Sequence, residues 1–148
     1  MPHARVPSAP VPAASASDAL LAEVGAPPRG HALVIGHRTL ETLCGLIRRG
    51  CTGAAELRPG EPGALRPDAA QIAVIPDPAS LAEAALCVAI ARRALSGGGR
   101  IAIRDAAGRH RRELTTLLRT QGFVAVSARD TPHGLLVLGK WPLRTQRN

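Results

Sequence analysis

Two uninterrupted apolar runs constrain the fold of this chain more than any other feature of its sequence. HALVIG, residues 31–36, and QIAVIPD, residues 71–77, each carry four or more apolar residues without polar alternation. Such runs are typical of strands that are covered on both faces, as in a parallel sheet between helices. The chain is therefore expected to form a sheet with helices on each side.

Segments with helical periodicity separate the expected strands. Helices are expected over 17–25, 38–50, 80–99 and 108–122, and strands over 31–36, 52–57, 71–77, 100–105, 123–128 and 134–141. Strands that alternate with helices predict a mostly parallel sheet with right-handed crossovers. Residues 129–133 are a connection short enough for an antiparallel hairpin. The expected fold class is α/β: a doubly wound, mostly parallel sheet of about six strands with a C-terminal antiparallel hairpin.

Three local patterns refine the helices. In the second expected helix, apolar residues recur at i, i+3, i+4 and i+7 and predict one buried stripe; they are Leu40, Leu43, Cys44 and Ile47. Ser80 and Glu83 have the spacing of a capping box at the start of the third helix. The glycine triplet 97–99 is expected to end that helix in a turn. A phosphate site there is disfavoured, because the triplet follows a helix and the helix dipole points the wrong way.

Length and composition point to one domain. The chain has 148 residues, of which 45% are apolar, enough for a sizeable core. Residues 1–16 are rich in Pro, Ala and Ser and are expected to be a disordered leader, residues 17–141 the folded domain, and residues 142–148 a basic tail. No apolar run approaches the ~20 residues of a membrane span. The three cysteines are odd in number and lie in apolar segments, which favours reduced thiols and a cytoplasmic location.

Positive charge is concentrated in the second part of the chain. Residues 92–148 contain 12 Arg or Lys and three acidic residues. A candidate surface for nucleic acid or another acidic partner comprises Arg104, Arg109, Arg111, Arg112 and Arg119. Phosphate contacts from such a surface would be salt-sensitive and independent of sequence. The alternative is a solvated helix face in a chain whose composition favours arginine, with 18 Arg and one Lys.

Two further kinds of site are disfavoured by the sequence. The chain has only two aromatic residues, Phe123 and Trp141, which are too few for specific stacking on the bases of a single strand. Its histidines are scattered and no CxxC motif is present, so no metal site is expected.

Three stretches resemble class I S-adenosylmethionine-dependent methyltransferases. ALVIG, residues 32–36, resembles the family's first strand and the start of its glycine loop. ARRALSGGGRIAIRD, residues 91–105, resembles a later helix, glycine-rich turn and strand, and residues 117–141 resemble the closing helix, strand and antiparallel hairpin. The resemblance covers residues 31 to about 141. It implies a Rossmann-like fold with strand order 2-1-4-5-7-6 in the family's own labels.

The cofactor loop departs from the family pattern of G-x-G-x-G. Gly36 matches the first glycine, but Arg38 and Leu40 stand at the second and third, where side chains would intrude on the cofactor. Glu56, 20 residues after Gly36, matches the acid that holds a ribose hydroxyl in such folds; it is equally an ordinary acid at an exposed strand end. Residues 57–70 are too few for the helix, edge strand and helix that the family has there, and much of the adenine pocket would be absent with them.

Asp77 is a weak catalytic candidate. It ends a strand, and ligands gather at the carboxyl ends of parallel strands. The surrounding IPDP resembles part of the D/N-P-P motif of amino-group methyltransferases, but the second proline and the aromatic residue are missing. Asp77 is equally explained as a helix-entry residue before the Ser80 cap.

The resemblance and its departures lead to one expected function and two alternatives. The chain is expected to be a catalytically degenerate methyltransferase-like domain that does not bind S-adenosylmethionine. It would act as an interaction or regulatory module, with a protein partner or a second copy bound at the open sheet edge. The first alternative is an active small methyltransferase, acting on nucleic acid, that uses Gly36, Glu56 and Asp77. The second is non-specific nucleic-acid binding through the basic C-terminal part. A membrane is not an expected partner.

Overall fold

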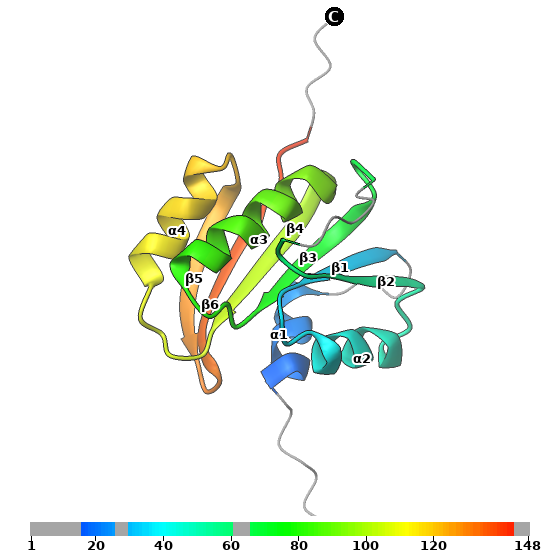
Figure 1. Ribbon diagram of the computed structural model, residues 1–148, viewed down its shortest axis with the longest axis horizontal. Coiled ribbons are helices and arrows are strands. Elements are labelled where there is room, and N and C mark those ends of the chain that lie inside the picture. The colour runs from blue at the N-terminus through cyan, green and yellow to red at the C-terminus, as the bar shows by residue number, and fades with distance from the viewer. Residues whose placement is uncertain (1–15, 26–29, 61–65, 144–148) are drawn as a thin grey trace, which may run out of the picture.

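A computed structural model describes residues 16–25, 30–60 and 66–143. These residues form one six-stranded sheet between two helical layers (Figure 1). Residues 1–15 of the expected leader and residues 144–148 of the expected tail lie outside the described part of the chain.

The order of helices and strands agrees with the sequence-based expectation. The helices of the described part are α1 (Ala16–Val24), α2 (Leu40–Arg48), α3 (Leu81–Ala94) and α4 (Arg111–Thr120). The strands are β1 (His31–Ile35), β2 (Gly53–Leu57), β3 (Ala70–Pro76), β4 (Leu95–Asp105), β5 (Val124–Thr131) and β6 (Gly134–Lys140). None of the helices in these ranges is long and apolar enough to cross a membrane.

The sheet has the order β2-β1-β3-β4-β6-β5. β2, β1, β3 and β4 pair in parallel, whereas β6 pairs antiparallel with both β4 and β5. Once the strands are renumbered, this is the order 2-1-4-5-7-6 that the resemblance implied. The doubly wound α/β fold with a C-terminal antiparallel hairpin is confirmed.

Successive side chains of the apolar strands point to opposite faces of the sheet, and helices cover both faces. The strands are therefore buried on both sides. Val34, Val74 and Ala102 belong to the core beneath α1 and α2. Their neighbours Ile35, Ile75 and Ile103 belong to the core beneath α3 and α4. Figure 1 shows the two helical pairs on opposite sides of the sheet.

The predicted cap of α3 is present. The Ser80 hydroxyl accepts a hydrogen bond from the Glu83 amide at 3.1 Å. The Glu83 carboxylate accepts one from the Ala79 amide at 2.6 Å. Amides at the helix start that have no partner within the helix are thereby satisfied.

The prediction of a turn at the glycine triplet is wrong. β4 begins at Leu95 and runs through the glycines. The Gly98 amide donates to the Trp141 carbonyl at 2.9 Å, and the Trp141 amide donates to the Gly99 carbonyl at 2.7 Å. The β3–β4 register shifts between Ala70 and Ile72 at this point. The glycines therefore form an irregular start of a strand, a role in which glycine is common.

The predicted buried stripe of α2 is also wrong. Leu40 is 71% exposed and Ile47 is 59% exposed, while Leu43 and Cys44 are half-buried. The helix instead turns Thr42, Gly45 and Leu46 inward. Small side chains let α1 approach closely: a Cβ on Gly45 would lie 2.9 Å from Cδ1 of Leu21. The consequence is an apolar stripe on the outside of the molecule.

Candidate functional site

The carboxyl ends of β1 and β3 meet at a small pocket. Its volume is about 260 Å³, and it is lined by His37, Arg38, Asp77, Ala79 and Glu83. Gly36, at the start of the loop, has a φ of +153°, a conformation that favours glycine. An added Cβ there would find its nearest atom 3.8 Å away. Gly36 is therefore required by the backbone conformation and not by a close neighbour in the chain.

Glu56 lies near the end of β2 and is bonded to the loop that follows β1. Its carboxylate accepts a hydrogen bond from the Thr39 hydroxyl. Thr39 is the N-cap residue of α2 and is 3% exposed, but its side chain makes no capping bond. The Gly36 amide also donates to the Leu57 carbonyl at 3.0 Å. The loop after β1 and the end of β2 are therefore joined through both backbone and side chain.

Asp77 joins the end of β3 to the end of β4. Its amide donates to the Arg104 carbonyl at 2.8 Å, and its carboxylate accepts from the Ala106 amide at 3.0 Å. Asp77 has a φ of +53°, which is uncommon for a residue other than glycine. Strain of this kind is found at functional sites, but here one backbone hydrogen bond and one side-chain hydrogen bond hold Asp77 in place. Beside it, Nε2 of His37 lies 3.5 Å from the Glu83 carboxylate.

The five candidate arginines do not form one surface. Arg104 lies two residues after Ala102 on β4, so the two side chains point to the same face of the sheet. That face is the one covered by α1 and α2. Arg111, Arg112 and Arg119 lie on α4, which covers the opposite side.

The arginines at α4 also differ among themselves. The Arg111 guanidinium pairs with the Asp130 carboxylate at 2.7 Å and donates to the Ala128 carbonyl. Arg109 precedes α4, where its amide donates to the buried carboxylate of Asp105. The exposed charge of this part of the chain is therefore divided between two faces, and part of it is neutralised.

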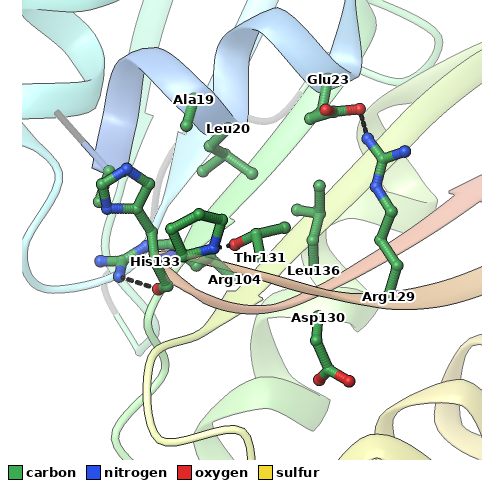
Figure 2. Close-up of a pocket in the computed structure, with 11 residues that line it drawn as sticks. Ala19, Leu20, Glu23, Arg104, Arg129, Asp130, Thr131, His133 and Leu136 are labelled. Atoms are coloured by element: carbon green, nitrogen blue, oxygen red, sulfur yellow. Dashed lines mark hydrogen bonds and ion pairs between the residues drawn. The ribbon is translucent and has the colours of Figure 1, made fainter. Parts of the chain in front are cut away.

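A second pocket lies between α1 and the β5–β6 hairpin. Its volume is about 320 Å³. Figure 2 shows Arg129 reaching from the hairpin to Glu23 of α1, with which it forms an ion pair. The Arg104 guanidinium donates to the His133 carbonyl at 3.2 Å. The buried side chains of Leu20 and Leu136 supply apolar lining.

Sequence reasoning did not find this second pocket. Its lining comes from α1, β4 and the hairpin, which lie far apart in the chain and share no motif. Of its lining residues only Arg104 is a candidate from the sequence, and the sequence groups it with the arginines of α4, which lies on the other side of the sheet. Pairing of the hairpin with β4 is the one signal that would have placed Arg104 near residue 133.

The described residues give little support to a metal-binding site or to a nucleophilic cysteine. Within the described ranges, no three His, Cys, Asp or Glu side chains are grouped so as to hold a metal ion. All three cysteines are free thiols, with Cys51 and Cys87 buried and Cys44 half-buried. Burial raises the pKa of the Cys87 thiol to about 12, and the nearby Glu83 carboxylate adds to the rise. Cys87 therefore stays protonated at neutral pH and is no nucleophile.

Comparison with known proteins identifies the fold. No protein-family model matches the sequence, and no curated protein matches it. Solved structures do match. An O-methyltransferase family protein from Burkholderia thailandensis has a TM-score of 0.63 and 16% identity, over 87% of this chain and 56% of its own. A SAM-dependent methyltransferase from Aquifex aeolicus has a TM-score of 0.62 and 10% identity, over 86% of this chain and 89% of its own.

A third similar structure carries ligands. It is the 1,6-didemethyltoxoflavin-N1-methyltransferase of Burkholderia thailandensis, with 1,6-didemethyltoxoflavin and S-adenosylhomocysteine bound. Its TM-score is 0.61 and its identity 19%, over 85% of this chain and 76% of its own. The chain thus spans between about half and nine tenths of these proteins. At such low identity the likeness establishes a Rossmann-like, methyltransferase-like fold.

Proposed function

We propose that this methyltransferase-like domain does not bind S-adenosylmethionine and acts as a non-catalytic interaction module. The observation that carries the proposal is the state of Glu56. In a methyltransferase this position would hold the ribose of the cofactor, whereas here the carboxylate is bonded to the Thr39 hydroxyl. One of the two carboxylate oxygens of Glu56 is thus already occupied, by a hydroxyl whose residue is 3% exposed.

The loop after β1 supports the same conclusion. Arg38 stands where the family has its second glycine, and its side chain lines the pocket at the carboxyl ends of β1 and β3. That pocket holds about 260 Å³, whereas pockets for ligands of this size occupy roughly 300–1,000 Å³. The residues present therefore fit S-adenosylmethionine poorly.

The short connection after β2 removes a further part of a cofactor site. Between Leu57 and Ala70 the family would place an edge strand with a helix on either side. In this chain β2 is itself the edge of the sheet. Ala55 and Glu56 are exposed along it. Within the described ranges no further strand pairs with β2, so its outer edge can accept a partner.

The geometry gives no comparable support to nucleic-acid binding. Salt-sensitive binding to phosphates needs several cations on one surface. Arg104 lies on the opposite side of the sheet from α4, and Arg111 is paired with Asp130. The interaction module remains the function that the site favours.

Calorimetric titration of the full chain with S-adenosylmethionine and S-adenosylhomocysteine tests the proposal. We expect no saturable heat up to ~1 mM ligand, the upper end of the range in which enzymes bind their substrates. Stoichiometric binding in the micromolar range would contradict the proposal. If binding occurs and Glu56→Ala abolishes it, the cofactor site is intact, and transfer of labelled methyl groups then tests the active-methyltransferase alternative.

A further inference from the structure

We infer that the open edge of the sheet pairs with the same edge of a second copy of this chain. The open edge consists of β2 and the outward stripe of α2, formed by Leu40, Leu43, Cys44 and Ile47. Leu40 and Ile47 are exposed, whereas Leu43 and Cys44 are half-buried and Leu43 also packs against the core beneath α1 and α2. The inference rests on the proposed function and deepens it, because it names the partner of the interaction module.

The stripe of α2 faces the edge of the sheet. Thr42 and Gly45 contact α1, the former through a 3.1 Å hydrogen bond to Ser17. At 100° per residue, Leu40 lies about 140° around the helix from Gly45, and Ile47 lies about 140° from Thr42 in the other direction. The stripe is therefore opposite α1. Since α1 contacts β4 while α2 contacts β1 and β2, the stripe lies on the side of α2 that is turned away from the centre of the sheet.

The backbone of β2 offers hydrogen-bonding groups along the same edge. The Gly53 amide donates to the Gly30 carbonyl, and the Leu57 carbonyl accepts from Gly36. Because N–H and C=O directions alternate along a strand, Ala54 and Glu56 direct theirs away from β1. The β1–β2 register runs without a shift over the whole of β2. A second strand can therefore pair along a regular edge.

The spacing of the elements fits a twofold pairing of two copies. Strands are about 4.8 Å apart, and α2 contacts both β1 and β2. If β2 pairs antiparallel with β2 of a second copy, helices lying between β1 and β2 on each side are separated by about 10 Å. Packed helices lie about 8–10 Å apart. The two stripes would thus meet over a continuous sheet.

In this arrangement the charges of α2 in one copy are complementary to those of α2 in the other. Glu41 lies in the first turn and Arg48 in the last, three and four residues from Cys44. Two antiparallel copies crossing near Cys44 bring Glu41 of one beside Arg48 of the other. Arg48 also pairs with Asp18 of α1 at 3.8 Å, and its 64% exposed side chain would have to share its guanidinium between Asp18 and Glu41 of the second copy.

The side chains of β2 are compatible with antiparallel pairing of two copies. A twofold axis at Ala55 places Glu56 opposite Ala54 of the second copy, so no like charges are directly opposed. The outward groups of Ala54 and Glu56 would then exchange hydrogen bonds with one another. A partner of another sequence would not share this internal symmetry, so the second copy is the favoured occupant.

Sedimentation equilibrium of the full chain tests the inference. At about 100 µM, well above a micromolar dissociation constant, we expect a mass about twice the 15.4 kDa of one chain. The variant Leu40→Glu with Ile47→Glu places charge on the stripe and should give a monomer. The matched control is Leu86→Glu on α3, where Leu86 is 57% exposed on the opposite side of the sheet. Circular dichroism of each variant confirms that it is folded.

Each outcome bears on the inference. A dimer that the double variant abolishes and Leu86→Glu preserves supports it. A monomeric native chain contradicts it, as does a dimer that survives the double variant or one that both variants abolish. Mild oxidation provides a second test, because Cys44 is half-buried whereas Cys51 and Cys87 are buried. A disulfide-linked dimer that Cys44→Ser prevents supports the antiparallel crossing, and no linkage in a dimeric sample contradicts it.

The two proposals fail in different experiments. If S-adenosylmethionine binds but the dimer forms as described, the proposed function is wrong and the pairing stands. If no cofactor binds and the chain is monomeric, the pairing is wrong and the proposed absence of cofactor binding stands.

Discussion

The two edges of the sheet differ in how they are protected from pairing. At β5, the register with β6 shifts between Val124 and Ser127, and Ala125 has a φ of +51°. Arg129 and Asp130 carry charge on the same strand, each in an ion pair. Bulges and charges are the devices by which proteins keep an edge strand from pairing with other chains.

The β2 edge lacks these devices. Its register with β1 is regular, and Glu56 is its one charged residue. The exposed apolar stripe of α2 lies beside it. The comparison teaches that β5 has the features that prevent pairing, whereas β2 and the exposed residues of α2 form an edge that lacks them.

The largest expected effect concerns the turn that completes the protected edge. An added Cβ on Gly134 would lie 2.6 Å from the Asp105 carbonyl oxygen, and Gly134 has a φ of +114°. Backbone strain of about 1–3 kcal/mol and a clash of similar size should make Gly134→Ala cost at least about 2 kcal/mol. Urea unfolding measures this loss. Gly60→Ala is the control, because Gly60 has a φ of +87° with open space around it. Equal losses for the two variants would show that the hairpin does not need this close contact.

A lysine on each edge tests the comparison itself. Ala55→Lys places two like charges opposite one another at the proposed twofold axis, and like charges directly opposite on paired strands are destabilising. The dimer dissociation constant should rise more than about tenfold. Val124→Lys on the β5 edge, where Val124 is 47% exposed, should leave it unchanged. Sedimentation of both variants decides the point, and a reversed pattern would identify β5 as the pairing edge.

Cys87 supplies a smaller effect at the centre of the fold, away from both edges. Burial raises its pKa to about 12 in the folded protein, against 9.0 for a solvated thiol. At a pH between these two pKa values, the Cys87 thiol is deprotonated in the unfolded chain but stays protonated in the folded chain. Stability should therefore be intact below pH 9 and fall above it, by up to about 1.4 kcal/mol per pH unit.

Cys87→Ala tests this linkage. Denaturant midpoints at pH 8 and pH 10 should differ less for the variant than for the native chain. An unchanged difference would show that other groups cause the alkaline loss.

The smallest effect is expected from the charge pair that joins α4 to β5. The side chains of Arg111 and Asp130 are 48% and 83% exposed. Exposed ion pairs contribute about 0–1 kcal/mol. Arg111→Ala should lower the free energy of unfolding by less than about 1 kcal/mol, and the loss should shrink further in high salt. A larger, salt-independent loss would mean that Arg111 stabilises β5 through packing.

Much of the fold could be predicted because local sequence patterns indicate which strands are buried and in which order helices and strands follow along the chain. The runs at 31–36 and 71–77 are buried on both faces as expected, and the strand order agrees with the resemblance. The stripe of α2 was misread for a physical reason. Periodicity predicts that Leu40 and Ile47 share a face, but not whether that face meets the same chain or another one.

The site was harder to predict than the fold. Thr39 lies at the start of α2 and Glu56 near the end of β2. Their hydrogen bond therefore depends on how these two elements pack, which no local sequence pattern shows. Arg104 was grouped with the arginines of α4 because they are close in sequence. The alternation of side chains along β4 puts it on the other side of the sheet.

Hydrogen exchange at the amides of β2 tests the central claim most directly. If the open edge serves association and no longer catalysis, the amides of Ala54 and Glu56 should become more protected as protein concentration rises. Added S-adenosylmethionine should leave their exchange unchanged. Rapid exchange at every concentration, with protection that appears only when S-adenosylmethionine is added, would contradict the account.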